Sequence, residues 1–292
     1  MKKKYIGLLF IIPWLIGFLM FTLYPFISSF VLSFTEYNII NPPEFVGLSN
    51  YVNMFANDPD FWSSMLATFK YVFFTVPLKL VFALFIAFIL NFELKGINLY
   101  RTAYYIPSIL GGNIAISVLW RFLFSTNGLI NQTIGVFGAE PLPWFSSGLG
   151  AMITISLLRI WEFGSAMLIF LAALKEIPKD LYDAAAVDGA GKVKVFFKIT
   201  IPLLTPIIFF NLVMQMIHAF QEFNGPYMIT NGGPMKETYL FSMLIYDNSF
   251  KYFNMGYASA ISWVLFVIIM IFTLLVFRSS SYWVYYSDEA GG

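Results

Sequence analysis

The chain has 292 residues, of which 59% are hydrophobic and only 11% are charged, and its formal net charge is +1. Because a soluble domain carries about a quarter charged residues, this composition excludes an ordinary soluble protein and indicates one that crosses a membrane several times. The near-neutral charge gives no electrostatic reason to bind nucleic acid. The absence of cysteine excludes a disulfide framework, and the single histidine argues against a metal-dependent enzyme.

Six segments are long and apolar enough for a transmembrane helix, which needs about 20 mostly apolar residues. They are residues 6–33, 67–91, 103–124, 149–174, 203–222 and 258–277. The first follows three lysines, as a signal peptide would, but its apolar run is too long and lacks a small-x-small cleavage site, so we interpret it as an uncleaved span. We therefore expect an all-α polytopic membrane protein with six transmembrane helices in a single domain over residues 1–292.

The Lys and Arg residues outside these spans gather on one side of the membrane. The segments on the side of the N-terminus hold 11 of them, five in the loop 175–201, and the segments on the other side hold 2. Cytoplasmic loops carry an excess of Lys and Arg. This asymmetry predicts that both termini and the loop 175–201 are cytoplasmic.

The loop 175–201 contains a candidate short helix. Leu181, Ala184, Ala185 and Val187 give it a small, flat apolar face, and Gly189 should end it. A helix this short is not stable alone in water, so it should lie against something, and two adjacent alanines suggest close contact with another protein. An ordinary loop between two spans explains the same residues equally well.

The spacing within this loop is similar to a known motif. Asp183-Ala184-Ala185 is followed after four residues by Gly189, and after ten more by Ile199-Thr-Ile-Pro202. This pattern resembles the EAA loop of ABC-importer permeases, with Asp183 where that family usually has Glu. The resemblance implies a coupling helix that docks in a cleft of a cytoplasmic ATPase subunit. The residues implied in coupling are Asp183, Ala184, Ala185, Asp188, Gly189 and Ala190.

Segments outside the loop extend the resemblance from about residue 9 to 275. They are Thr22–Pro25, Phe45–Tyr51, Asp58–Trp62 and Thr230–Pro234, which look like the sugar-importer branch and its larger, maltose-type permease subunit. The resemblance implies the type I ABC importer permease fold in a bacterial inner membrane. It also implies a second permease subunit as heterodimer partner, an extracytoplasmic sugar-binding protein and a cytoplasmic ATPase dimer. ATP and Mg²⁺ would bind that ATPase, and this chain would need no cofactor.

Polar side chains within the spans should face the bundle or a water-filled path, because lipid exposure costs several kcal/mol. Span five carries Asn211, Gln215, His218 and Glu222, spaced four, three and four apart. On a helix they fall within about 60° of one another. This stripe favours the lining of a passage, and interhelical hydrogen bonds that hold the bundle together are the alternative.

Span four adds Arg159, Trp161 and Glu162. Arg159 and Glu162 are three residues apart and could simply pair, or they could reach a substrate while Trp161 stacks on a sugar ring. The resemblance implies a substrate path built from spans four and five, because sugar contacts of maltose-type permeases come from these spans. We expect Lys79 to pair or to snorkel, and Ser259, Ser262 and Trp263 are weaker candidates.

One function, an ATPase, is excluded by the sequence, and three others remain to be weighed. Gly191-Lys192 looks like part of a phosphate loop, but Ala186 and Val193 replace the residues that the motif requires, so this chain is not expected to be an ATPase. We expect the permease subunit of an ATP-driven, binding-protein-dependent importer for a sugar or oligosaccharide. An ion-coupled secondary transporter would have internal repeats and broken helices. An intramembrane enzyme would need a catalytic constellation, and we expect neither catalytic nor metal-binding residues.

Overall fold

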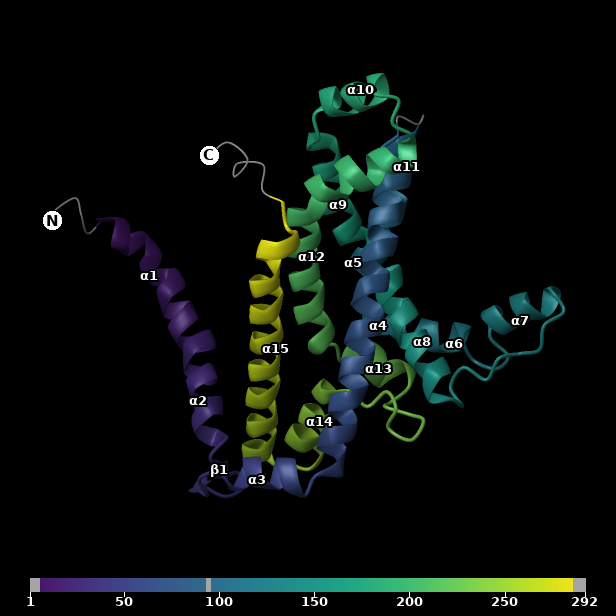
Figure 1. Cartoon of the computed structure of the whole chain (residues 1–292). Coiled ribbons are helices and arrows are strands. Elements are labelled where there is room, and N and C mark those ends of the chain that lie inside the picture. The colour runs from purple at the N-terminus through teal and green to yellow at the C-terminus, as the bar shows by residue number, and fades with distance from the viewer. Residues whose placement is uncertain (1–5, 93–95, 286–292) are drawn as a thin grey trace. The chain divides into compact units, whose positions relative to one another are not determined.

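The structure of the chain is a computed structural model that describes residues 6–92 and 96–285 (Figure 1). The termini expected in the cytoplasm, 1–5 and 286–292, lie outside the described residues. Strands in the described part of the chain are limited to β1 (Thr35–Glu36) and β2 (Glu44–Phe45), an antiparallel pair in which Thr35 lies opposite Phe45. The rest of the regular structure is helical, which confirms the all-α class.

Four helical stretches are long and apolar enough to cross a membrane: Phe10–Leu32, α4 (Pro59–Leu90), Lys192–Phe220 and α15 (Met255–Trp283). Two more spans are bent pairs of helices. The pair α5 (Ile97–Leu110) and α6 (Ile114–Leu123) is bent by 102°, and the pair α8 (Gly148–Trp161) and α9 (Gly164–Glu176) by 47°. With each pair counted as one span, the described residues contain the six spans expected. Continuous helices over 103–124 and 149–174 were the wrong expectation.

Local sequence explains the break between α5 and α6, and the backbone at Glu162 marks the break between α8 and α9. Gly111 and Gly112 adjoin, and the Asn113 side chain then accepts a hydrogen bond from the backbone N–H of Ala115 at 2.9 Å, which caps the start of α6. Helix α8 ends at Trp161, because Glu162 has ψ 34° and leaves the helical region. A β-carbon on Gly111 would lie 2.1 Å from Cγ of Glu162, so only glycine allows the two breaks to pack this closely.

Two spans pass through π-helical turns just before a proline. The first consists of α1 (Ile6–Phe18), a π turn (Leu19–Leu23) and α2 (Tyr24–Leu32), which contains Pro25. The fifth consists of α11 (Lys192–Val195), the π turn η3 (Phe196–Thr200) and α12 (Ile201–Phe220), which contains Pro202. Proline lacks an N–H and crowds the carbonyl four residues earlier, and a wider turn relieves both problems. The expected start of span five at residue 203 is therefore wrong, and most of the loop 175–201 is helical.

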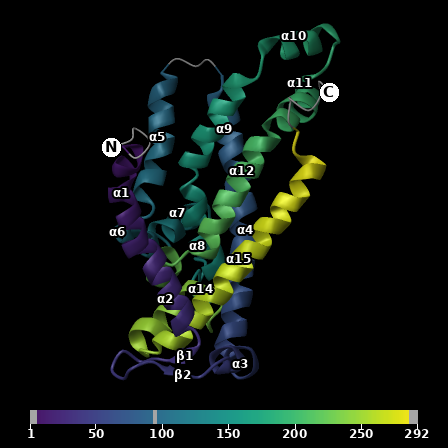
Figure 2. The same cartoon turned by 90° about the vertical axis from the view of Figure 1, so that its left-hand side faces the viewer.

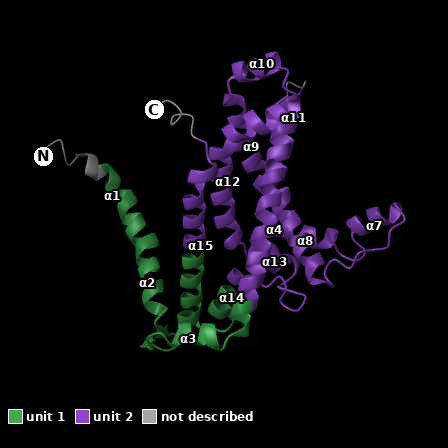
Figure 3. Cartoon of the chain, viewed as in Figure 1, with its two compact units in different colours: residues 1–62, 244–268 green, residues 63–243, 269–292 purple. Residues whose placement is uncertain are grey.

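The chain divides into two compact units (Figure 3). Unit 1 comprises residues 1–62 and 244–268, and unit 2 comprises residues 63–243 and 269–292. Within unit 1, the Trp263 ring lies 4.7 Å from the rings of both Phe26 and Phe30, and its Nε1 donates to Ser29 Oγ at 3.2 Å. Trp263 therefore packs α15 against α2. The expected single domain stays a prediction.

The remaining short elements connect these spans. They are α3 (Ser49–Ala56), α7 (Leu129–Val136), α10 (Lys179–Val187), α13 (Asn224–Ile229), α14 (Phe241–Tyr246) and the π turn η4 (Asp247–Lys251). Within unit 2, α9 contacts both α5 and α12 (Figure 2). In Figure 1, α10 lies at one end of this unit, and α8 and α13 lie away from that end.

The core of unit 2 is largely aromatic. Tyr71, Phe170 and Phe220 are almost completely buried. The Phe220 ring lies 5.6 Å from Phe69 and 5.7 Å from Phe272, so α4, α12 and the second half of α15 share one packed cluster. This packing holds the rigid spans from which the polar residues described below project.

Candidate functional site

Four charged side chains from separate segments of unit 2 form a charged cluster: Lys79, Arg159, Glu162 and Glu222. Arg159 Nη1 lies 2.6 Å from Glu162 Oε2, and Arg159 Nε lies 3.6 Å from Glu222 Oε2. The Lys79 residue is only 3% exposed, and the charges of Arg159, Glu162 and Glu222 act on it. Two cations therefore stand against two carboxylates, and the cluster is formally neutral.

The cluster lies at the two helix breaks. Glu162 is the first residue beyond α8, and Arg159 precedes it by less than one turn. Ser108 Oγ of α5 donates to the Glu162 carbonyl at 3.1 Å and accepts from the Ser165 N–H at 3.0 Å. Together with the close approach of Gly111, these contacts attach the break between α5 and α6 to the break between α8 and α9.

Glu222 connects the end of span five to the same cluster. Helix α12 ends at Phe220, and Glu222 lies in the turn that leads to α13. Its Oε1 accepts the Gly225 N–H at 3.3 Å, and its carbonyl accepts the Ser242 hydroxyl. The side chain thus caps the next segment while it faces Arg159.

Burial makes this pairing energetically necessary. Each buried ion costs several kcal/mol unless a partner and hydrogen bonds offset the loss of water. The side chains of Glu162 and Glu222 are only 9% and 16% exposed. Of the two alternatives left open for Arg159 and Glu162, the structure shows the pair. Lys79 does not snorkel to a surface, and its place among two carboxylates explains why it is tolerated in a span.

The polar stripe expected on span five fails at Glu222, whereas Asn211, Gln215 and His218 lie on α12 with the expected helical spacing. Asn211 is 1% exposed and donates to the carbonyl of Ile207 on its own helix at 3.1 Å. Gln215 is half-buried and His218 is exposed. Glu222 lies beyond the end of α12, so helical spacing does not apply to it. The four residues therefore have four different surroundings, and their role as a passage lining stays a prediction.

Trp161 has an aromatic neighbour that the sequence reasoning missed. The Trp120 ring lies 5.7 Å from the Trp161 ring, and its Nε1 donates to the carbonyl of Thr154 at 3.0 Å. Both tryptophans are half-buried. A straight third span would have given no reason to bring Trp120 to the end of α8, whereas the bend before α6 does so.

The predicted short helix exists as α10, and its end is well defined. Gly189 has φ +70°, the left-handed conformation that glycine adopts most easily. The Ala190 N–H donates to the Ala185 carbonyl at 2.9 Å, and the Gly189 N–H donates to the Ala186 carbonyl at 3.1 Å. This pair of bonds is the Schellman motif of helix ends, so the prediction that Gly189 ends the helix is confirmed.

The alanines of α10 do not share one face. Ala185 is buried against this chain, and the hydroxyls of Tyr182 and Thr200 lie 3.1 Å apart, which holds the same side of α10 to η3. Ala184 is exposed, and Val187 is 88% exposed. The expected single flat face over both alanines is therefore wrong. The outward surface consists of Ala184 and Val187 with Leu181.

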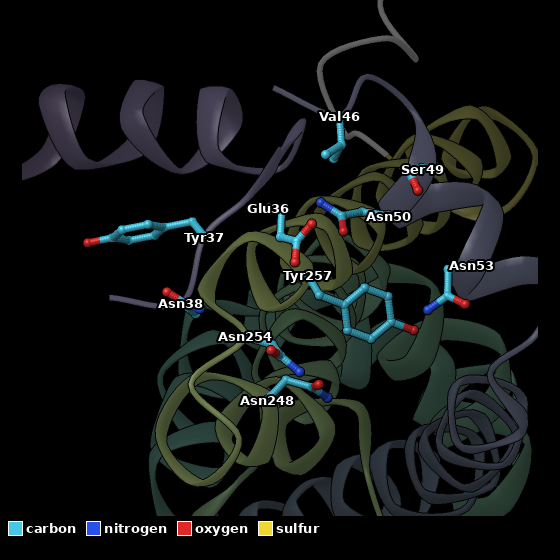
Figure 4. Close-up of a pocket in the computed structure, with 10 residues that line it drawn as sticks. All are labelled: Glu36, Tyr37, Asn38, Val46, Ser49, Asn50, Asn53, Asn248, Asn254 and Tyr257. Carbon is cyan, nitrogen blue, oxygen red and sulfur yellow. The ribbon is translucent and has the colours of Figure 1, made fainter. Parts of the chain in front are cut away.

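Unit 1 has a polar cavity of about 310 Å³ that the sequence reasoning did not identify (Figure 4). It is lined mainly by amide and hydroxyl side chains: Asn38, Asn50, Asn53, Asn248, Asn254, Ser49 and Tyr257, together with Glu36. The Tyr257 hydroxyl donates to Asp58 Oδ2 at 2.5 Å, and the Tyr37 ring points away from the other labelled side chains. A concentration of asparagine in the segment 38–53 was the available signal.

Metal binding has no candidate in the part of the chain that the structure describes. No group of three or more His, Cys, Asp or Glu side chains is arranged there to hold an ion. The two carboxylates of the charged cluster face cations instead. The expected absence of a metal site on the whole chain stays a prediction.

Comparison with known proteins assigns the family. Residues 48–286 match the family described as "Binding-protein-dependent transport system inner membrane component". The chain is 48% identical over 291 residues to "Probable ABC transporter permease protein YesP" of Bacillus subtilis, covering 99% of this chain and 94% of that protein. It is 33% identical over 287 residues to "Trehalose/maltose transport system permease protein MalF" of Thermococcus litoralis, covering 95% of each.

A solved structure confirms the fold. The permease chain of a bacterial ABC transporter involved in the import of the acidic polysaccharide alginate superposes with a TM-score of 0.84, covering 96% of each chain at 22% identity. The likeness establishes the type I ABC importer permease architecture and carries no information on substrate. The chain belongs to the family of binding-protein-dependent transport system inner membrane components.

Proposed function

We propose that this chain is the permease subunit of an ATP-driven importer that receives a sugar or oligosaccharide from an extracytoplasmic binding protein. The observation that carries the proposal is similarity over nearly the whole chain to permeases named for sugars. Examples are "Arabinooligosaccharides transport system permease protein AraP" of Bacillus subtilis at 34% identity over 96% of this chain, and the trehalose/maltose permease. The chain itself would hold no cofactor and perform no catalysis.

Coupling to ATP would run through α10. We assign the outward surface of Leu181, Ala184 and Val187, flanked by Asp183 and Asp188, to the cleft of a cytoplasmic ATPase that binds ATP and Mg²⁺. Ala185, Gly189 and Ala190 would act inside the chain, because they form the buried side and the cap of α10. A capped helix attached to span five through Tyr182 and Thr200 can transmit movement of the ATPase dimer to that span.

The substrate path would run beside the charged cluster. His218 is exposed, and Arg159, Lys79 and Glu222 act on it electrostatically. Arg159, Glu162 and Glu222 already bind one another, so we assign them to holding the broken spans in register beside the path. Trp161 with Trp120, Gln215 and His218 would contact the sugar, the aromatic faces covering its apolar side. Asn211 would stabilise α12.

Membrane placement follows from the charge asymmetry of the sequence. We propose a multi-pass protein of a bacterial inner membrane with both termini and α10 in the cytoplasm. The polar cavity of unit 1 is lined mainly by the segments between spans one and two and between spans five and six, which the same asymmetry assigns to the outer side, where they would offer hydrogen-bonding groups to the binding protein. A second permease subunit would complete the translocation path as a heterodimer partner.

Copurification tests the coupling assignment. An affinity-tagged chain, expressed with candidate ATPase and second permease subunits, should retain both through detergent purification. Ala184→Asp should release the ATPase, because it places a charge on the outward surface, while Lys194→Asp, also exposed but outside α10, serves as the control. Retention of the ATPase by Ala184→Asp at wild-type level would contradict the assignment.

A self-contained secondary transporter is the second candidate, since the two bent spans are the kind of broken helix that such proteins use. The family match favours the importer. A chain that transports substrate in vesicles with an ion gradient and without any ATPase subunit would restore this alternative.

A further inference from the structure

An apolar groove runs along unit 2 between the second half of α4 and the segment that begins at Lys192. It encloses about 590 Å³, and nine of its ten lining residues are apolar, five of them phenylalanines. The exposed fractions of Phe85, Phe92 and Phe197 are 57%, 54% and 63%. Both walls of the groove belong to helical stretches long and apolar enough to cross a membrane, so this aromatic surface lies where lipid chains can reach it.

The groove has one charged end. Along α4 and the two residues that follow it, the lining runs from Val81 to Phe92. Along the facing segment it runs from Ile201 back to Lys192. Because the two segments run in opposite directions, Phe92 and Lys192 mark one end and Val81 and Ile201 mark the other. Among the described residues of the lining, the one cation therefore stands at one end of an otherwise apolar groove. No carboxylate pairs with Lys192 among the residues that the structure describes.

The length of the groove matches one leaflet of a bilayer. Residues 81 to 90 of α4 span about 14 Å at 1.5 Å per residue, and Phe92 extends the lining just beyond the end of the helix. The hydrocarbon core of a bilayer is about 30 Å thick, so one leaflet contributes about 15 Å. The charged end also coincides with the side on which the lysines of the chain gather, where the anionic lipids of a bacterial inner leaflet would meet Lys192.

The π turn η3 determines which side chains line the groove. The π turn η3 places two successive side chains, Phe196 and Phe197, in the same lining, with ring centroids 5.2 Å apart. Phe196 also packs on Phe88 at 5.0 Å. An adjoining cavity of about 400 Å³ shares Phe88, Phe92, Phe196 and Lys192 with the groove and extends to Ala186 and Ala190 of the α10 segment.

We propose that this groove is a binding site for one anionic phospholipid, with an acyl chain along the phenylalanines and the phosphate on Lys192. The occupant is a lipid because the groove combines an apolar length of one leaflet with the Lys192 cation at its end. A lipid seated there contacts the π turn through which α10 joins span five. The site would therefore make the stability of that junction depend on anionic lipid.

Native mass spectrometry of the purified transporter, this chain with its partner subunits, tests the proposal. The detergent-solubilised complex is titrated with palmitoyl-oleoyl-phosphatidylglycerol and, separately, with the matching phosphatidylcholine. We expect phosphatidylglycerol to bind preferentially, and Lys192→Gln to weaken its binding about fivefold, which is the effect of about 1 kcal/mol per lysine near an anionic surface. Lys194→Gln is the matched control, since Lys194 is also exposed but lies outside the lining.

A second pair of variants separates the acyl chain from the headgroup. Leu84→Trp fills the groove and should remove lipid binding, whereas Ile89→Trp, on the same helix but outside the lining, should not. Glycerol phosphate, which is a headgroup without chains, should not compete. Melting temperatures show that the variants are folded.

Three results would overturn the proposal. They are equal binding of the two lipids, wild-type binding of phosphatidylglycerol by Lys192→Gln or Leu84→Trp, and competition by glycerol phosphate alone. A cysteine placed at Phe197 in this cysteine-free chain adds a fourth: if a thiol reagent fails to label it in the delipidated complex, a partner subunit covers the groove and the lipid assignment is wrong.

Discussion

The charged cluster predicts an unequal response to the loss of its two carboxylates. Glu162→Gln keeps the shape of the side chain but removes the negative charge 2.6 Å from Arg159, which leaves Lys79 and Arg159 facing Glu222 alone. Removal of one partner from a buried ion pair costs about 3–5 kcal/mol. We expect the lower end, about 3 kcal/mol, because Arg159 retains Glu222.

Glu222→Gln should have a smaller effect. Its contact with Arg159 is longer, at 3.6 Å, and a glutamine Oε1 still accepts the Gly225 N–H. We expect about 1 kcal/mol. For a unit of this size each kcal/mol lowers the melting temperature by about 2–4 °C, so the two variants should melt about 6–12 °C and 2–4 °C below the wild type. The measurement is thermal unfolding of the purified chain in detergent.

A double variant provides the internal control. Lys79→Met combined with Glu162→Gln restores the neutrality of the cluster and should recover at least ~1 kcal/mol of the loss caused by Glu162→Gln alone. Equal melting temperatures for the wild type and both single variants, or no recovery in the double variant, would refute the view that balanced charge holds the broken spans together.

Three further predictions test the breaks, the α10 segment and the topology. Gly111→Ala should destabilise by about 1–3 kcal/mol, because its β-carbon would lie 2.1 Å from Glu162 Cγ, while Gly112→Ala meets nothing within 4 Å and should melt like the wild type; similar melting of both would show that the breaks do not pack as described. Ala185→Asp should lower the melting temperature because Ala185 is buried. Ala184→Asp should leave the melting temperature unchanged and abolish sugar-stimulated ATPase activity, because Ala184 is exposed on the surface assigned to the ATPase. A single cysteine at Gly233 should react with a membrane-impermeant thiol reagent in intact cells and one at Ala184 should not, and the reverse labelling would overturn the orientation.

The sequence predicts the number and approximate place of the spans well, because apolar length is a local property that a membrane imposes directly. It predicts their continuity poorly. Gly111-Gly112 indicates a helix break and Asn113 indicates an N-cap, but the mean hydropathy over residues 103–124 is high enough to predict one continuous span. At Pro202 the sequence suggests a break where the structure has none. The proline indicates a helix boundary, but the π turn η3 lets the helix continue through it.

The site is harder to predict than the fold, since its members come from distant segments. The pairing of Arg159 with Glu162 follows from a spacing of three, and the end of α10 follows from Gly189. Lys79 and Glu222 join them only through tertiary packing, and Trp120 reaches Trp161 only because of the 102° bend. Helical spacing misplaces Glu222 because the helix ends two residues earlier, and it cannot tell that Ala185 faces inward while Ala184 faces outward.

Uptake into proteoliposomes tests the central claim most directly. The chain is reconstituted with its second permease and ATPase subunits, ATP is enclosed, and binding protein loaded with labelled sugar is added outside. The account predicts accumulation that requires both ATP and the binding protein and that Ala184→Asp abolishes. Accumulation driven by an ion gradient in the absence of ATP and binding protein would contradict it.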